Sequence, residues 1–334
     1  MNRKEIVSLI ILILVISFGL YRYLTRSYTS EKSQYLMDTI VKVSGTSKSK
    51  DINPKIDKVF EYIKRLEKDL NEYKEGGWLW EVNNSDSYQY PMNPDAYKIL
   101  LVADSMYKLS GGSFDITIKP VFDLWQFSSA NPQVPDSLLI KKTLKTVGFD
   151  KIKYDDKYLY KPSGMQFTFG ALAKGYILDK AKEYMKSLDL EKGFIDCHSS
   201  MTFYGNSFLP EMVGIQHPRK MNDIIASLQV KDTSVGTSGD YQQFFEINGI
   251  RYHHILDAHT GFPVKNVYSV TVLNPSALLA DGLSTALFLM NPEQAIDKIK
   301  NMPHTDAIIY YQKNNTIMSL KSQGIKNIIQ SEKG

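Results

Sequence analysis

Cysteine is nearly absent from this chain of 334 residues, and neither sign of charge dominates it. A single cysteine, Cys197, excludes an intrachain disulfide framework and any cysteine-rich zinc module. The 20 glycines and 13 prolines are ordinary numbers, which exclude collagen-like and low-complexity proteins. The hydrophobic fraction of 43% excludes a disordered chain, and a chain of this length can bury a sizeable core.

The small basic excess lies at the amino terminus. The formal net charge is +4, and the first 29 residues contribute +3 of it through Arg3, Lys4, Arg22 and Arg26 against Glu5. The remaining residues carry a net charge of only +1. A nearly neutral body lacks the basic face that nucleic-acid binding requires, so we expect no nucleic-acid partner.

One long apolar run, residues 6–20, contains no charged residue. As a helix it spans roughly 22 Å, and snorkelling of Lys4 and Arg22 can extend it towards a ~30 Å hydrocarbon core. The sequence predicts that residues 1–27 form a membrane anchor or a signal segment. No small-x-small cleavage motif follows the run, and Cys197 is too distant for a lipoprotein signal. We expect the rest of the chain to be extracytoplasmic (periplasmic) and the protein to be held at the cell membrane, although a buried core helix is the alternative.

The remaining chain shows alternating helix and strand signals. Residues 28–35 are polar and are predicted to be a tether, and residues 36–330 are predicted to form one domain. Helices are expected from Asn53-Pro54, from Asn93-Pro94, over 173–188, over 276–290 and from Pro292. Short strands are expected at 195–197, 212–216, 225–230, 244–247, 252–256, 268–272 and 307–311. The strands of the second half follow one another like hairpins, which favours an α+β fold over a doubly wound sheet.

Two glycine-containing segments could form backbone cradles for a polar ligand. Gly111-Gly112 ends a predicted helix, and a predicted strand then places Asp115 and Thr117 on one face. An ordinary helix stop is the alternative interpretation. Residues 168–176 enter a helix with Lys174 in its first turn, which suits a pyrophosphate, although no hydroxyl follows the lysine as a P-loop requires. A glycine-rich turn with a solvated lysine is the alternative there.

Two further segments combine residue types that are typical of catalytic sites. His253 and His254 are adjacent in a predicted strand and point to opposite faces, so at most one faces a given site. A histidine near Asp257 is a candidate general acid or base, while a structural histidine is the alternative and the spacing matches no common zinc pattern. Asp281 and Thr285 are four residues apart on a predicted helix and share a face. Their oxygens suit Mg²⁺, although such a pair also occurs on solvated faces.

Six segments, taken in order, resemble the ApbE-type flavin transferases, the FAD:protein FMN transferases. The resemblance covers roughly residues 35–330. It rests on LMDT at 36–39, GGSFDITIKP at 111–120 with the later Leu124-Trp125, GALAKGYILD at 170–179, TSGDY at 237–241, HILD at 254–257 with the following Thr260-Gly261, and DGLSTAL at 281–287. It implies an ApbE-like, T-fold-related α+β fold of mixed sheets with packed helices.

The resemblance also implies a reaction and a set of site residues. Its members bind FAD and Mg²⁺ and transfer FMN to a Thr or Ser of a membrane redox complex subunit, with release of AMP. By this likeness the metal ligands are Ala171 through its carbonyl, Asp281 and Thr285. His254 is implied as the base or its orienting group, with Asp257 as a second candidate. The implied flavin contacts are Met37, Tyr73, Ser113, Phe114, Asp115, Thr168, Lys174 and Ile255.

Three departures from the family pattern concern the same segments. The family's Gly-Gly-Asn turn corresponds to residues 196–200, which contain no glycine. The family's Asp-Pro-x-Thr-Gly corresponds to residues 257–261, where Ala258 replaces the proline. Thr168 replaces the aspartate that usually begins the glycine loop. These changes leave the implied metal ligands intact, but we expect them to affect flavin affinity and transfer. An FAD pyrophosphatase and a non-catalytic flavin-binding protein are the alternative functions.

Overall fold

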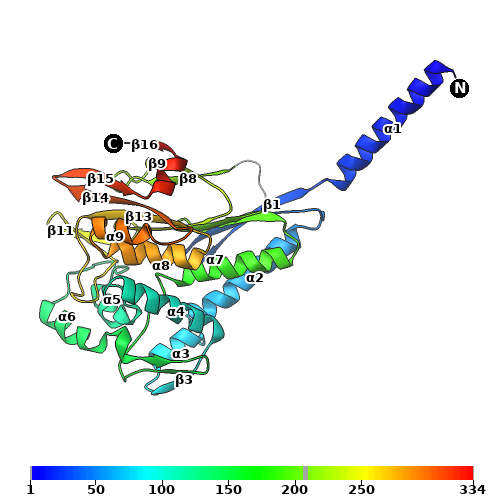
Figure 1. The fold of residues 1–334 in the computed structure, drawn as a ribbon. Helices are drawn as coiled ribbons and strands as arrows, with labels where there is room; N and C mark the ends of the chain where they lie inside the picture. Colours follow the sequence, from blue (N-terminus) through cyan, green and yellow to red (C-terminus); the bar gives the residue numbers. More distant parts are fainter. Residues whose placement is uncertain (1, 206–209, 334) are drawn as a thin grey trace.

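An eight-stranded sheet forms the centre of the computed structural model, which describes residues 2–205 and 210–333 (Figure 1). Its strand order is β1-β2-β6-β7-β10-β13-β14-β15, and the neighbouring strands pair antiparallel. The strands are β1 (Tyr28–Leu36), β2 (Thr39–Ser47), β6 (Lys192–Asp196), β7 (Ser200–Tyr204), β10 (Ser234–Gly239), β13 (Val267–Asn274), β14 (Asp306–Lys313) and β15 (Thr316–Lys321).

Long helices cover one face of this sheet (Figure 1). Helix α2 places a continuous apolar stripe inward, because Ile56, Val59, Phe60 and Ile63 recur at helical spacing and are all buried. Burial of each such side chain contributes about 1.5–3 kcal/mol to folding. The predicted helices are confirmed as α2 (Asn53–Leu70), α4 (Pro94–Leu109), α7 (Ala173–Ser187), α8 (Ala277–Phe288) and α9 (Pro292–Ile299).

A smaller sheet of order β16-β9-β8 packs over the other face of the large sheet. Val213, Ile215 and Leu228 from the small sheet form an apolar cluster with Ile308 and Tyr310 of β14. Strand β14 is therefore buried on both faces, which explains its nearly continuous apolar sequence. The elements are β8 (Glu211–Gln216), β9 (Ile224–Val230), α10 (Gln323–Ile328) and β16 (Ile329–Glu332).

The remaining elements are short, and some of them build a separate apolar cluster around the indole of Trp125, with Val121, Ile140 and Phe245. The indole ring stacks on Phe127 at a centroid distance of 5.7 Å, and its Nε1 donates a hydrogen bond of 2.9 Å to the Gly261 carbonyl. The indole thus fixes the loop that follows His254. These short elements are α3 (Trp78–Asn84), β3 (Gln89–Pro91), η1 (Ile116–Ile118), α5 (Lys119–Trp125), α6 (Ser137–Thr143), η2 (Leu144–Thr146), η3 (Phe149–Lys151), β4 (Lys153–Tyr154), β5 (Tyr158–Tyr160), β11 (Phe244–Ile247) and β12 (Ile250–His253).

Two local predictions are wrong. Residues 28–35 are not a tether, because strand β1 pairs with β2 from Tyr28 to Leu36 at the edge of the large sheet. An edge strand with little burial needs few apolar residues, so its sequence resembles a linker. The folded body therefore begins at residue 28 rather than 36. The strand expected after Gly112 is instead the 3-10 helix η1, because the Asp115 carboxylate accepts the Thr117 N–H at 2.7 Å and caps that turn.

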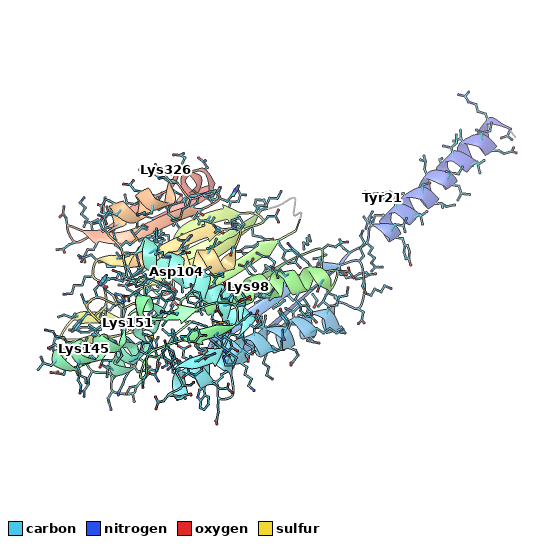
Figure 2. All side chains as sticks on the ribbon, turned by 60° about the horizontal axis from the view of Figure 1, so that its bottom comes forward. Tyr21, Lys98, Asp104, Lys145, Lys151 and Lys326 are labelled. Carbon is cyan, nitrogen blue, oxygen red and sulfur yellow. The ribbon has the colours of Figure 1, made fainter. Side chains whose placement is uncertain are left out.

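Helix α1 (Arg3–Leu24) projects away from the body, with its N-terminus at the far tip and Tyr21 near the end that joins the body (Figures 1 and 2). Asn2 and Glu5 form a capping box at its start. Its 22 residues span about 33 Å, and none of its side chains is buried against the body. The helix is long and apolar enough to cross a membrane, a test that a signal sequence also passes.

Candidate active site

The carboxylate of Asp281 lies where α7, α8 and the start of β7 meet. Its side chain is buried, with 6% exposure. The Ser200 hydroxyl donates to Oδ1 at 2.8 Å, and the Gly175 N–H donates to Oδ2 at 2.9 Å. Burial raises the pKa of Asp281, and the positive charge of Lys174 opposes this rise. Each carboxylate oxygen keeps a further lone pair, so the group can still accept a cation.

Two glycines allow the backbone of neighbouring elements to approach α8 at this point. A Cβ at Gly175 would lie 2.3 Å from the Ala277 carbonyl oxygen, and one at Gly236 would lie 2.5 Å from the Ala280 carbonyl carbon. Real side chains cannot occupy such space. The position of Asp281 therefore depends on the close packing of α7 and β10 against α8.

Three oxygens could hold a hard cation here, two from α8 (Asp281 and Thr285) and one from the loop before α7 (the Ala171 carbonyl). In a regular helix the Gly175 N–H would donate to the Ala171 carbonyl, but here it donates to Asp281. Within residues 2–205 and 210–333 the Ala171 carbonyl accepts no hydrogen bond. The Thr285 hydroxyl lies 2.9 Å from the Ser238 hydroxyl, one helical turn beyond Asp281. Carboxylate, hydroxyl and carbonyl oxygens are the donors that Mg²⁺ accepts. Among the described residues no group of three or more His, Cys, Asp and Glu side chains could hold a metal.

Lys174 lies in the first turn of α7, next to this carboxylate. Its Nζ donates to the Ser199 hydroxyl at 2.7 Å. Its charge opposes the rise in the pKa of Asp281 and lowers the pKa of His254, so it lies within electrostatic reach of both. A cation at a helix N-terminus suits a phosphate group.

The turn from β6 to β7 is the one in which the family glycines are missing. His198 there has a φ of +65°, a left-handed conformation that costs a residue with a Cβ roughly 1–2 kcal/mol. Its N–H donates to the Asp196 carboxylate at 2.7 Å, which stabilises the turn without glycine. Burial raises the pKa of the neighbouring Cys197 thiol. Ser199 is thereby still presented to Lys174 despite the changed sequence.

Three predicted flavin contacts gather near the C-terminal end of α2. The Met37 N–H donates to Glu67 Oε1 at 2.9 Å, and the Thr168 hydroxyl donates to Glu72 Oε1 at 2.6 Å. Tyr73 is 62% exposed, and the Lys119 Nζ lies 4.5 Å from its ring centroid. Sequence reasoning missed both glutamates. A signal was available for Glu67, because it lies on the apolar face of α2.

The predicted contacts Ser113, Phe114 and Asp115 form a turn next to the histidine loop. Asp115 Oδ1 accepts hydrogen bonds from the Thr117 N–H and hydroxyl, and Oδ2 accepts one from the Phe149 N–H. Its carboxylate thus holds this turn, and burial raises its pKa. Phe114 is buried, and the Ser113 carbonyl accepts the Ala258 N–H at 3.1 Å. The turn is therefore tied directly to the segment after His254.

The two adjacent histidines differ in burial, although strand β12 ends at His253 and His254 lies just beyond it. His253 is buried, with its Nε2 2.8 Å from the Val264 carbonyl and its Nδ1 accepting the N–H of the buried Ile255. His254 is half-buried, and its Nδ1 lies 3.2 Å from the Gln243 carbonyl. A carbonyl only accepts, so Nδ1 carries the proton and Nε2 keeps a lone pair. Burial, His253 and Lys174 lower the pKa of His254 to about 4.

Asp257 is not hydrogen-bonded to His254 within the residues that the structure describes. Its Oδ1 accepts the His259 N–H at 2.9 Å, and its carbonyl accepts the Gly261 N–H at 2.7 Å. The carboxylate therefore stabilises the turn around residues 257–261. His254 is the stronger candidate for a proton acceptor.

Comparisons with known proteins agree with this arrangement. The sequence model of the ApbE family matches residues 37–309. The chain is 28% identical over 269 residues to an FAD:protein FMN transferase of Klebsiella pneumoniae (strain 342), covering 78% of this chain and 84% of that protein. It is 27% identical over 303 residues to an FAD:protein FMN transferase of Treponema pallidum (strain Nichols), covering 84% of both.

Solved structures show the same fold. The crystal structure of the ApbE protein of Thermotoga maritima superposes with a TM-score of 0.82 at 28% identity, covering 91% of this chain and all of that one. The flavin transferase ApbE of Vibrio cholerae gives a TM-score of 0.81 at 21% identity with the same coverage. Because the family match spans most of the sequence, this chain belongs to the ApbE family.

Proposed function

We propose that this protein is a Mg²⁺-dependent flavin transferase that moves FMN from FAD onto a Thr or Ser hydroxyl of an acceptor protein, releasing AMP. The observation that supports it most is the buried Asp281 carboxylate, which accepts the Gly175 N–H and lies within electrostatic reach of Lys174. Relatives named FAD:protein FMN transferase support the flavin substrate. The acceptor would be a subunit of a membrane redox complex.

The residues have complementary tasks in this reaction. Asp281, Thr285 and the Ala171 carbonyl would hold Mg²⁺, which when bound neutralises the pyrophosphate charge. Lys174 binds the pyrophosphate next to the N-terminus of α7 and stabilises the charge that develops on AMP. The acceptor hydroxyl oxygen forms a bond to the FMN phosphorus while the bond from that phosphorus to the AMP oxygen breaks. The hydroxyl proton passes to Nε2 of His254, whose Nδ1–H is held by Gln243.

The direct test is covalent flavinylation. The full chain in detergent is incubated with FAD, Mg²⁺ and candidate acceptor proteins, and the acceptors are analysed by mass spectrometry for an FMN adduct on Thr or Ser. An adduct that requires both FAD and Mg²⁺ is the expected result. Release of FMN and AMP without an acceptor, at the rate of any transfer, would indicate an FAD pyrophosphatase. FAD that binds but stays intact with Mg²⁺ would indicate a flavin-binding protein without catalysis.

The low pKa of His254 predicts the pH dependence of transfer. His254 is neutral above its pKa of about 4, and only the neutral ring can accept a proton. We therefore expect kcat/KM to fall on the acid side only as the pH approaches 4, rather than near 6.5. Initial rates between pH 4 and 8 measure this. His254→Gln should remove the acid limb and lower the rate by ~10²–10⁴, whereas His304→Asn should leave the profile unchanged. An acid limb near 6.5 that persists in His254→Gln would contradict the assignment.

Helix α1 would hold the body at the extracytoplasmic side of the cell membrane. A chain that starts at Ser27 keeps β1 and all its pairing with β2, so it should fold and appear in the soluble fraction. The full chain should stay in the membrane fraction after a high-salt wash. Fractionation followed by immunodetection measures both, and added protease should cleave the body in spheroplasts but not α1. A mature protein whose mass lacks residues 1–26 would show a cleaved signal instead.

A further inference from the structure

Glu72 lies just beyond the C-terminal end of α2 and is joined to a distant loop. Its Oε1 accepts the Thr168 hydroxyl at 2.6 Å across 96 residues of sequence. Within residues 2–205 and 210–333 this is the one hydrogen bond from another residue's side chain to Glu72. The backbone N–H of Glu72 itself also donates to this carboxylate, whose oxygens keep lone pairs for a further donor.

Among the described residues no cation forms an ion pair with Glu72, although the positive charge of Lys119 lowers the pKa of its carboxyl group. The nearby Lys119 is 2.8 Å from the Asp123 carboxylate, so its charge already has a partner. Burial is the largest influence on Glu72, and it raises the pKa of this carboxyl group. A partly buried carboxyl group without its own cation lowers the stability of the fold, and a ligand that donates a hydrogen bond to it offsets that cost. Its chain neighbour Tyr73 is exposed next to the same lysine.

The Thr168 position is the one at which the family resemblance leads us to expect an aspartate. Threonine offers a hydroxyl there but no carboxyl group. In this chain the Thr168 hydroxyl donates to Glu72. A carboxyl group therefore still lies next to position 168, but it comes from the segment after α2.

We propose that Glu72 is a flavin-binding residue that supplies, from the end of α2, the carboxyl group missing at position 168. This inference rests on the proposed function, because it assigns a ligand contact within the same FAD site. The carboxyl group accepts a hydrogen bond from a donor on the flavin half of FAD through Oε2, while Oε1 orients Thr168. Glu72 is thereby a specificity residue for the flavin rather than for the adenosine half.

Four variants of the full chain test this through FAD affinity, measured by titration calorimetry with Mg²⁺. Glu72→Ala should raise the Kd for FAD by about 10-fold to 100-fold, the usual effect of losing a charge-assisted hydrogen bond. Thr168→Asp with Glu72 present places two carboxyl groups about one hydrogen-bond length apart, so like-charge repulsion should also weaken binding. The double variant Glu72→Ala/Thr168→Asp should recover wild-type affinity within about 3-fold. Glu72→Gln should bind FAD as poorly as Glu72→Ala although its amide oxygen can still accept the Thr168 hydroxyl.

The controls separate a binding role from a structural one. Glu75→Ala removes an exposed acid from the same segment and should bind FAD like the wild type. ADP affinity should be unchanged in all variants, because the contact is to the flavin half. Wild-type FAD affinity in folded Glu72→Ala and Glu72→Gln, or a double variant no better than Glu72→Ala, would overturn the inference. A wild-type chain that does not bind FAD would instead overturn the proposed function.

Discussion

Replacing Asp281 with asparagine should lower the rate of FMN transfer by about 10³-fold or more. Asparagine has nearly the shape of aspartate, and its oxygen can still accept a hydrogen bond from Ser200 or Gly175. It carries no charge, however, so the cation would lose its only anionic ligand among the three oxygens. Transfer to an acceptor protein, followed by mass spectrometry at several Mg²⁺ concentrations, measures the effect.

The stability of the Asp281→Asn variant distinguishes this explanation from loss of the fold. Burial raises the pKa of Asp281, so ionisation of this side chain at neutral pH opposes folding when no cation is bound. The neutral variant should therefore melt at the same temperature as the wild type or above it, while its activity is lost. Activity within tenfold of the wild type would contradict the assignment of Asp281 as a metal ligand.

Asp179→Asn is the matched control for the same helix pair. The Asp179 carboxylate accepts hydrogen bonds from the Ser276 hydroxyl and from the N–H groups of Ala277 and Leu278, at the start of α8. Its replacement should lower the melting temperature, as the loss of a helix cap typically costs about 1 kcal/mol. Transfer activity at 25 °C should change far less than in Asp281→Asn. The two variants thus separate the ionic role of one aspartate from the structural role of the other.

The elements that could be predicted from the sequence are those whose signals are local. Asn93 before Pro94 predicted the start of α4, and the Asn93 side chain indeed accepts the N–H groups of Asp95 and Ala96. The periodic apolar residues of α2 predicted a buried face in the same way. Strand β1 was missed because its hydrogen bonds are made to β2 and its side chains are largely exposed, so nothing in its own composition marks it.

The candidate site shows the same division between local and distant contacts. Asp281 and Thr285 could be paired from their spacing on one helix. The contact from Ser200 to Asp281 joins residues 81 apart, and the contact from Thr168 to Glu72 joins residues 96 apart. No periodicity or motif in a single sequence indicates such pairs. The flavin contacts implied by resemblance included Thr168 but not Glu72, because the contact between these two residues depends on tertiary packing.

The second large effect is expected from a single added methyl group in Gly175→Ala. The new Cβ would lie 2.3 Å from the Ala277 carbonyl oxygen and 2.7 Å from the Asp281 Cβ. Both neighbours belong to the closely packed helix α8, so α7 and α8 must move apart. Overpacking of this kind typically costs about 1–3 kcal/mol of unfolding free energy, which denaturant titration measures.

The matched substitution for that titration is Gly170→Ala in the same loop. Its Cβ would meet only the Thr168 hydroxyl, at 3.4 Å, so unfolding free energy should stay within about 0.5 kcal/mol of the wild type. The separation of α7 from α8 in Gly175→Ala would also lengthen the hydrogen bond from the Gly175 N–H to Asp281 and displace the Asp281 carboxylate from the loop before α7. Mg²⁺ affinity, measured by calorimetry in the presence of FAD, should therefore fall together with stability. A Gly175→Ala variant with wild-type stability and wild-type Mg²⁺ affinity would show that the close approach of the two helices does not position the carboxylate.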